Sequence, residues 1–312
     1  MADSKRTKSD SSDINPTGLQ EVQRGSESHQ PNKQNPLQSY KMDASHCGLC
    51  LIINNVKFLP ESYLRSRNGS NIDCDKLEKR FKSLNFIVDV QQDLTHEQII
   101  QQLSALSKKD HTKYDCCIVV ILSHGSKATK NLIPGAVHGV DGPTVPVEDI
   151  TSFLNGEHCP SLQGKPKIFF IQACGGDEKD KGREVPIQES SDRYSRDAVP
   201  VSGSDTLTDK PDKFSVHTTL PVPSDILVSY STYPGYVSWR DKETGTWYVE
   251  TLDQILAENA ASNDLVTMLT MVNNKVAQNS VKDISTTYKQ MPFFLSSLRK
   301  NLYFQCSPKG DS

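Results

Sequence analysis

Strand-like and helix-like segments alternate along the chain from about residue 48 onward, and this alternation limits the possible folds more than any other feature. The clearest strand is CCIVVILS at 116–123, which is apolar almost throughout, as expected for a strand covered on both faces. Apolar residues then recur every three or four positions in the stretches between such runs, as they do in helices. The pattern predicts strands at 51–56, 86–90, 116–123 and 167–172, and helices around 77–84, 95–106 and 147–155. Strict alternation predicts an α/β fold with parallel strands and helices on both faces of the sheet.

The last part of the chain continues this pattern less regularly. Strands are predicted at 226–231 and 247–250, helices around 251–260 and 263–278, and strand-like segments at 291–295 and 298–304.

Two polar stretches divide the chain. Residues 1–44 are rich in Ser, Asp, Gln, Asn and Lys, a composition that cannot bury enough apolar surface to offset the entropy of ordering. Residues 177–224 are charged and rich in Ser, Asp and Pro, and a segment of that length inside a compact domain indicates function or disorder. We therefore expect a disordered tail at 1–44, a large portion at 45–176, a linker at 177–224 and a small portion at 225–312.

Composition excludes several classes of function. The formal net charge is −3, which gives no electrostatic field that would imply a nucleic acid or an anionic membrane as partner. The longest apolar run is Cys116–Leu122, far shorter than the roughly 20 residues of a membrane helix, and the N-terminus lacks an apolar signal region. A soluble, cytoplasmic protein is expected, with its eight cysteines reduced. Cys47 and Cys50 form a CxxC without a second ligand pair, so neither a metal nor another cofactor is expected.

Chemistry-bearing residues follow two of the predicted strands. His124 comes directly after the strand at 116–123, and Cys174 comes shortly after the strand at 167–172. Because the carboxyl ends of parallel strands meet at one edge of a sheet, these two side chains are expected to lie near each other. A cysteine acts as a nucleophile only as its thiolate, which a nearby imidazole can generate. The alternative is that Cys174 is a packed core thiol and His124 a hydrogen-bonded structural residue.

The residues around these two positions resemble a known family. The sequence QACGG at 172–176, with a histidine in a Ser-His-Gly setting 50 positions before the cysteine, resembles the signature of the caspases. The similarity runs from about residue 47 to 304 through SRNGSNID, ILSHG, FFIQACGG, VSYSTYPGYVSWR and GTWYVETL. The phrases LIINNV, SRNGSNID and YKQMP are most like those of an initiator caspase. The resemblance implies a three-layer sandwich around a mostly parallel six-stranded sheet.

The resemblance also implies an activity, that of a cysteine endopeptidase which cleaves after aspartate. Cys174 would be the nucleophile, His124 the acid and base, and the N–H groups of Gly125 and Cys174 the oxyanion donors. The substrate carboxylate would enter a pocket made by Arg67, Gln172 and Arg240, since guanidinium groups can donate two parallel hydrogen bonds to a carboxylate.

Further residues are implied to bind the substrate. Arg65 is the rival of Arg67 by sequence alone, but the family pattern places the pocket arginine directly before the Asn68-Gly69 turn. Trp239 and Trp247 would form the walls of neighbouring subsites, although they could instead be core residues. Residues 237–240, which include Ser238, would pair with the backbone of the substrate.

The linker contains a possible processing site. Cleavage after Asp197 would expose a new N-terminus at Ala198-Val199-Pro200-Val201. This tetrapeptide resembles the one by which inhibitor-of-apoptosis proteins capture an initiator caspase. The alternative is a chance triplet in a polar linker, and Asp205, Asp209 and Asp212 are other possible cleavage points.

Partners and regulation follow from the same resemblance. Initiator caspases carry an N-terminal recruitment domain of about 90 residues, and the polar tail at 1–44 puts assembly on an apoptosome adaptor in doubt. A homodimer is expected, with Phe293, Phe294 and Leu295 at its two-fold axis.

The leading function is an initiator-type protease in apoptosis, active as a dimer and regulated by linker cleavage. The alternative is a weakly catalytic homologue that acts as a regulatory decoy. A protease directed at basic residues is disfavoured, because arginines in the pocket would repel a cationic side chain.

Overall fold

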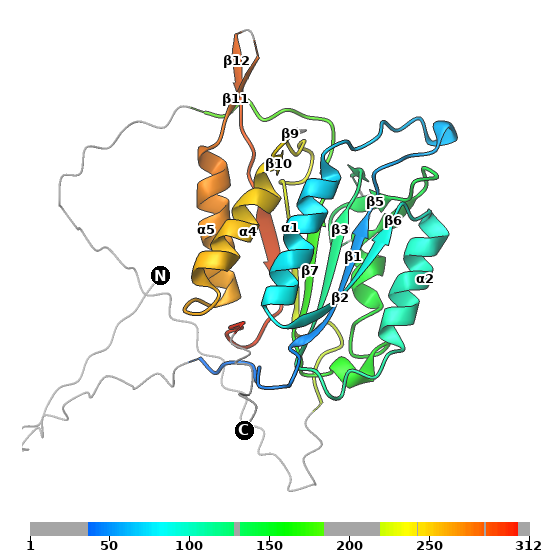
Figure 1. Ribbon diagram of the computed structural model, residues 1–312, viewed down its shortest axis with the longest axis vertical. Coiled ribbons are helices and arrows are strands. Elements are labelled where there is room, and N and C mark those ends of the chain that lie inside the picture. Colours follow the sequence, from blue (N-terminus) through cyan, green and yellow to red (C-terminus); the bar gives the residue numbers. More distant parts are fainter. Residues whose placement is uncertain (1–36, 128–131, 184–218, 242, 284, 305–312) are drawn as a thin grey trace, which may run out of the picture. The chain divides into compact units, whose positions relative to one another are not determined.

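The computed structural model describes residues 37–127, 132–183, 219–241, 243–283 and 285–304. Its centre is a six-stranded sheet with the strand order β13-β8-β7-β3-β1-β2 (Figure 1). The strands are β1 (Gly48–Asn54), β2 (Phe86–Gln92), β3 (Cys116–Leu122), β7 (Lys167–Gln172), β8 (Ile226–Tyr230) and β13 (Phe293–Ser296). Neighbouring strands are parallel except β13, which is antiparallel to β8. The predicted α/β fold with a mostly parallel sheet of six strands is confirmed.

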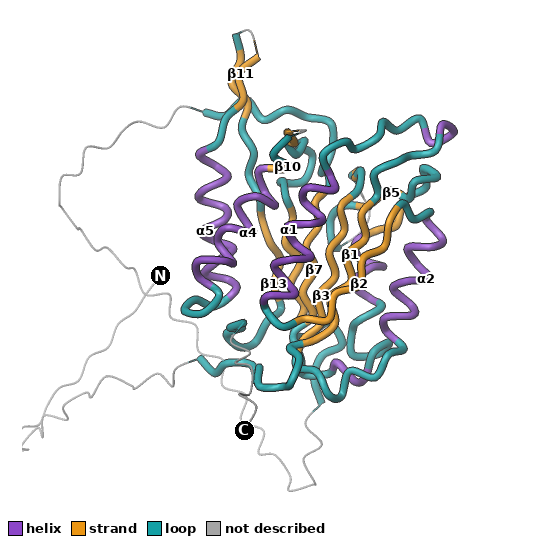
Figure 2. Tube along the Cα trace, viewed as in Figure 1, coloured by secondary structure: helices purple, strands orange, loops and turns teal. Residues whose placement is uncertain are grey.

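Helices cover both faces of this sheet. One face is covered by α1 (Ser70–Ser83), α4 (Trp247–Asn259) and α5 (Leu265–Gln278), as Figure 2 shows. The other face is covered by α2 (His96–Ser107) and α3 (Val147–Ser152). The described part of the chain therefore has three layers, helix, sheet and helix.

Shorter elements extend the loops at the ends of the strands. A three-stranded sheet contains β4 (Gly125–Ser126), β5 (Ala136–His138) and β6 (Thr144–Pro146). Two antiparallel pairs are β9 (Arg240–Asp241) with β10 (Gly245–Thr246), and β11 (Val281–Asp283) with β12 (Thr286–Tyr288). Two 3-10 turns are η1 (Pro60–Ser62) and η2 (Pro160–Leu162).

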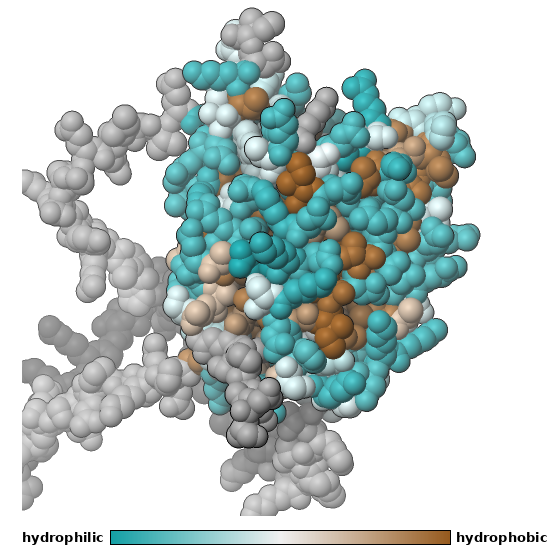
Figure 3. All heavy atoms as spheres, in the orientation of Figure 1, coloured by the Kyte–Doolittle hydropathy of each residue, from teal (hydrophilic) through white to brown (hydrophobic). Residues whose placement is uncertain are grey.

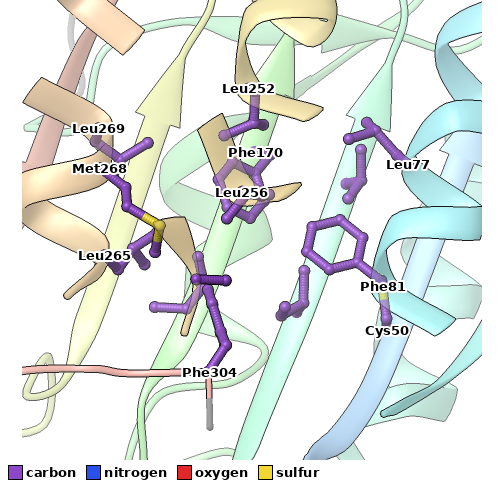
Figure 4. Close-up of a cluster of buried hydrophobic side chains, with 14 of the residues drawn as sticks. Cys50, Leu77, Phe81, Phe170, Leu252, Leu256, Leu265, Met268, Leu269 and Phe304 are labelled. Carbon is purple, nitrogen blue, oxygen red and sulfur yellow. The ribbon is translucent and has the colours of Figure 1, made fainter. Parts of the chain in front are cut away.

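The strands divide their side chains between two hydrophobic cores. In β1, Cys50 and Ile52 belong to the core under α1, α4 and α5, whereas Leu51 and Ile53 belong to the core under α2 and α3. This division follows from the two-residue period of a strand, and it explains why β1 and β3 are apolar on both faces. Figure 4 shows the first core, where Phe81 of α1 lies beside Phe170 of β7, with ring centroids 5.7 Å apart.

The segment Trp247–Glu250 is a helix and not the strand that its β-branched and aromatic residues predict. It forms the first turn of α4, and the Thr246 side chain caps this helix by accepting a hydrogen bond from the backbone N–H of Val249. Tyr248 and Val249 are buried against the first core. Tertiary packing and the N-cap therefore override the strand propensity of WYV. The strand-like segment at 298–304 forms only a single bridge, between Ser39 and Asn301.

The last residues of the predicted tail are part of the fold. Tyr40 is buried, and its hydroxyl donates a hydrogen bond of 2.6 Å to the Asp225 carboxylate. Arg299 donates to the same carboxylate at 2.8 and 3.0 Å. Because Asp225 stands at the start of the small portion, this network joins residues before β1 to β8 and to the segment after β13. The expectation of a disordered tail up to residue 44 is wrong for this segment, since Tyr40 and Met42 are buried in the first core.

The surface and the thiols also bear on the sequence predictions. On the face seen in Figure 3, hydrophilic side chains cover most of the described surface. None of the helices in the described residues is long and apolar enough to cross a membrane.

Most of the described cysteines are free thiols, namely Cys50, Cys74, Cys116, Cys117, Cys159 and Cys174. Cys47 is disulfide-bonded, which departs from the expectation that all cysteines are reduced.

Candidate active site

The site is built at the carboxyl ends of β3 and β7. These strands are paired in parallel up to Leu122 and Gln172, and the backbone N–H of Ser123 donates to the Gln172 carbonyl at 3.1 Å. The next residues therefore leave the sheet side by side. A Cβ added to Gly125 would lie 2.3 Å from the Cys174 carbonyl oxygen, so only glycine fits between the two segments. The structure thus brings the segment of His124 and Gly125 against the segment of Cys174, as the sequence predicts.

The His124 imidazole is held in one orientation. Its Nε2 lies 2.7 Å from the backbone carbonyl oxygen of Arg65. Because a carbonyl oxygen only accepts, Nε2 carries the proton, and Nδ1 is left as the acceptor of the neutral ring. Phe58 packs on the imidazole, with ring centroids 4.8 Å apart. Burial lowers the pKa of His124, and the charges of Arg67 and Arg240 lower it further, so the ring stays neutral to a lower pH than usual.

The Cys174 thiol is half-buried. Its Sγ accepts a hydrogen bond from the backbone N–H of Ser238 at 3.5 Å. Within the described ranges, no hydrogen bond joins this thiol to His124. Hydrogen bonds between catalytic groups are often formed only around a bound substrate, so the arrangement is compatible with a Cys-His pair.

Two arginines lie close enough to the thiol to interact with it electrostatically. Arg67 is buried at 1% exposure, and its Nη1 donates to the Asn55 carbonyl at 3.0 Å and to the Ser70 hydroxyl at 2.7 Å. Arg240 donates from Nε to the Asn68 carbonyl at 3.1 Å, which places it next to the turn that follows Arg67. Burial, together with the charge of Arg240, lowers the pKa of Arg67 to about 9. The repulsion between the two guanidinium groups, which a nearby carboxylate opposes only in part, favours an anionic group beside them.

Arg65 and Arg67 are distinguished by the structure. The Arg65 side chain is exposed, and it is the backbone of this residue that contacts His124. Arg67 is instead buried and interacts electrostatically with Arg240 and with Cys174. Of the two, only Arg67 therefore has its guanidinium among the other predicted pocket residues.

Gln172 and Ser238 connect the pocket to the thiol. The Gln172 amide nitrogen donates to the Ser238 hydroxyl at 2.8 Å. Its amide oxygen is buried and has no hydrogen-bond partner within the described part of the chain. The Ser238 backbone N–H contacts Cys174, so a chain of two hydrogen bonds links the Gln172 amide to Ser238 and Ser238 to the thiol.

An aromatic wall continues from the pocket. Trp239 and Trp247 are both partly exposed, and their ring centroids lie 6.2 Å apart. Trp239 also lies beside Tyr288, at 5.7 Å, and its indole N–H donates to the Lys289 carbonyl at 3.2 Å. Trp247 also packs in part against the first core. It therefore lies beside Trp239, as predicted for a subsite wall, and is at the same time partly a core residue, which was the alternative.

The backbone around Ser238 is largely engaged. The N–H groups of Val237 and Trp239 donate to the Glu178 carbonyl at 2.8 Å and to the Gln290 amide oxygen at 2.7 Å. These bonds fix the segment that the sequence predicts to pair with a substrate backbone, and that pairing stays a prediction.

Several residues of the site are missing from the sequence predictions. Asp73 is fully buried, and its Oδ1 accepts the backbone N–H of Thr246 at 2.9 Å. Burial raises the pKa of Asp73, and the charges of Arg67 and Arg240 oppose this shift. Gln290 joins Trp239 to the Ser231 carbonyl, to which it donates at 2.7 Å. The Arg65 carbonyl is a backbone atom, so no residue type could have indicated its contact with His124.

Asp197 and the motif Ala198-Val199-Pro200-Val201 lie outside the described residues. No group of three or more His, Cys, Asp or Glu side chains suited to a metal ion occurs in the described ranges.

The α/β fold, with a cysteine and a histidine at the ends of adjacent parallel strands, has the architecture expected of a cysteine peptidase. The comparisons with known proteins agree with it. Residues 47–303 match the family model for the caspase domain. The chain belongs to the caspase family of cysteine endopeptidases, which confirms the resemblance described above.

Two relatives illustrate the similarity. The chain is 51% identical to human caspase-9 over 274 residues, which cover 86% of this chain and 64% of that protein. It is 38% identical to caspase-3 of Oryctolagus cuniculus over 270 residues, which cover 85% of this chain and 87% of that protein. The aligned part thus spans less than two thirds of the length of human caspase-9.

Proposed function

We propose that this protein is an initiator-type caspase of the cytoplasm, a cysteine endopeptidase that cleaves protein substrates after aspartate in apoptosis. The observation that carries the proposal is the buried Arg67, held next to Arg240 and beside the half-buried thiol of Cys174. A buried pair of guanidinium groups is matched by a carboxylate, because each group can donate two parallel hydrogen bonds to it. The amide of Gln172 would add a further donor to that carboxylate.

The chemistry is acyl transfer. His124 Nδ1 takes the thiol proton, and Sγ of Cys174 attacks the carbonyl carbon of the substrate aspartate. The N–H groups of Gly125 and Cys174 stabilise the oxyanion. The C–N bond then breaks, and the imidazolium gives its proton to the departing amine, which leaves a thioester. Water that loses a proton to His124 hydrolyses the thioester, and the proton returns to Sγ.

The Arg65 carbonyl supports this cycle. Because it accepts from Nε2, it fixes the tautomer that presents Nδ1 to the thiol and stabilises the ring when both nitrogens are protonated.

The chain organisation follows the same proposal. The large portion would end at residue 176 and include the segment from residue 37, with the processing linker at 177–224 and the small portion at 225–312. Cleavage after Asp197 would expose Ala198, whose free amine an inhibitor-of-apoptosis protein could bind.

A homodimer would form along β13, the edge strand of the sheet, where Leu295 is 39% exposed. Phe293 and Phe294 pack partly against the two cores of the protomer, so Leu295 would contribute most of its side chain to the dimer.

The test is a rate measurement on a fluorogenic Leu-Glu-His-Asp peptide against protein concentration, with and without a kosmotropic salt. We expect rates that rise faster than linearly with concentration and a further rise with salt, because dimerisation completes the site. Cys174→Ala and the peptide Leu-Glu-His-Asn are the matched controls, and both should give no turnover. A folded protein that leaves the aspartate peptide uncut at every concentration would contradict the proposal and favour the regulatory decoy.

A further inference from the structure

The loop between β1 and α1 packs on the face of His124. It is closed at its base by a hydrogen bond of 2.8 Å from the Arg67 backbone N–H to the Val56 carbonyl. Both of its legs contact the imidazole, one through the Phe58 ring and the other through the Arg65 carbonyl. Residues 57–66, here named the β1–α1 loop, therefore continue the surface of the site beyond the imidazole.

The tip of this loop exposes apolar side chains. Tyr63 is 94% exposed, and Leu59 is 40% exposed. Leu59 and Tyr63 stand on one short loop beside the catalytic edge, and neighbouring exposed apolar side chains are suited to contact with a partner.

The backbone of the tip is fixed in place. The Leu59 N–H donates to the Val140 carbonyl at 2.9 Å, and the Ser62 hydroxyl donates to the Leu59 carbonyl at 2.6 Å. Tyr63 adopts a left-handed conformation with φ of 57°, which turns its side chain out of the tight η1 turn. A fixed backbone presents the tyrosine at a small entropic cost, as rigid aromatic residues do in binding surfaces.

The direction of a bound peptide follows from the chemistry of the site. The arginines bind the aspartate before the scissile bond, whereas His124 has to reach the amine that leaves after it. The peptide that follows the bond must therefore pass the imidazole and reach the surface that adjoins it. An extended chain advances about 3.3 Å per residue, so the residues after the bond run along the loop whose legs touch the ring.

We propose that the β1–α1 loop binds the substrate residues that follow the scissile bond and favours apolar ones, through Phe58, Leu59 and Tyr63. This inference rests on the proposed function and adds a specificity surface to it. The occupant is an extended apolar segment, and the chain itself contains one directly after an aspartate, Ala198-Val199-Pro200-Val201. The same loop would thus favour cleavage of the linker at Asp197 over cleavage at Asp205 or Asp212, which are followed by polar Thr206 and Lys213.

The test compares two substrates that share Leu-Glu-His-Asp. One ends in a coumarin leaving group and has no residues after the bond. The other is internally quenched and continues with Ala-Val-Pro-Val. The variant is Leu59→Ser with Tyr63→Asn, since asparagine tolerates the left-handed conformation of residue 63. The matched control is Leu37→Asn, which removes a side chain that is 62% exposed on the segment before β1.

The double variant should lose about five-fold or more in kcat/KM on the quenched peptide and keep its rate on the coumarin peptide. A quenched peptide that continues with Ala-Ser-Gln-Ser should be cut more slowly by the original protein and should be little affected by the variant. Equal loss on both original substrates, or no loss on either, would overturn the role of the loop. Absence of turnover by the unmodified protein on every substrate would refute the proposed function itself, and the loop's role with it.

Discussion

Oδ1 of Asp73 accepts the backbone N–H of Thr246 at 2.9 Å, and this bond joins α1 to the strand that pairs with Arg240. Asp73 is fully buried, and its other oxygen has no hydrogen-bond partner in the described ranges. Its negative charge also lies near both pocket arginines. The residue therefore has two roles, one as a hydrogen-bond acceptor and one as a counter-charge.

These two roles can be separated by substitution. Asp73→Ala should lower the free energy of unfolding by about 1–3 kcal/mol, because it leaves the buried Thr246 N–H without an acceptor. Asp73→Asn keeps an oxygen acceptor and should lose less. Urea denaturation of the three proteins measures the difference. Equal losses in the two variants would show that the charge, and not the hydrogen bond, is what matters for stability.

Arg67→Lys tests the aspartate pocket. Lysine keeps the charge but cannot form two parallel hydrogen bonds with a carboxylate, so kcat/KM on the Leu-Glu-His-Asp peptide should fall by about 100-fold. Arg65→Lys is the matched control, because Arg65 contacts His124 only through its backbone and its side chain is exposed. A similar loss in both variants would contradict the assignment of Arg67 as the pocket arginine.

The sequence is sufficient to predict the architecture and the residue types of the site. The sheet is predictable because β1, β3 and β7 are buried on both faces and are therefore apolar throughout. His124 and Cys174 are predictable because each follows such a strand. The roles of these residues, of Arg67 and of Arg240 stay predictions, and Cys174→Ala and Arg67→Lys test two of them.

Other parts of the site are not accessible from the sequence, for physical reasons. The contact of Arg65 with His124 uses a carbonyl, which every residue possesses. Asp73 and Thr246 are 173 positions apart, so their hydrogen bond exists only through the tertiary fold. The first turn of α4 has strand-like residues, and a helix forms there because Thr246 caps it and the core covers Tyr248.

The depressed pKa of His124 predicts the pH dependence of the rate. Attack requires a neutral imidazole that can accept the thiol proton, and burial keeps the ring neutral below its usual pKa of about 6.5. In a plot of kcat/KM against pH, the fall on the acid side reflects protonation of His124. The midpoint of this fall should therefore lie below pH 6.5. Phe58→Ser should hydrate the ring and move that midpoint upward. An unchanged midpoint in this variant would show that Phe58 does not shield the imidazole.

His111 predicts a pH dependence of stability. It is fully buried, its Nε2 donates to the Leu106 carbonyl at 2.9 Å, and its Nδ1 has no hydrogen-bond partner in the described residues. Burial lowers its pKa, so the unfolded chain binds a proton more readily than the folded chain does. This contribution to stability is complete above pH 6.5 and is lost as the pH falls below it, at up to about 1.4 kcal/mol per pH unit. Urea denaturation at several pH values should show a smaller slope for His111→Gln than for the original protein.

Gly125→Ala tests the packing that brings the two catalytic segments together. The new Cβ would lie 2.3 Å from the Cys174 carbonyl oxygen and 2.7 Å from the Ala173 Cβ. Backbone atoms cannot yield as a flexible side chain does, so the segments must separate, at a cost of about 1–3 kcal/mol in the free energy of unfolding. Separation moves Cys174 away from His124, and turnover should fall by more than the loss of folded protein explains. Gly156→Ala is the matched control, since its Cβ would meet no atom closer than 3.5 Å. Normal turnover by folded Gly125→Ala protein would show that the close approach of these two segments is not needed for catalysis.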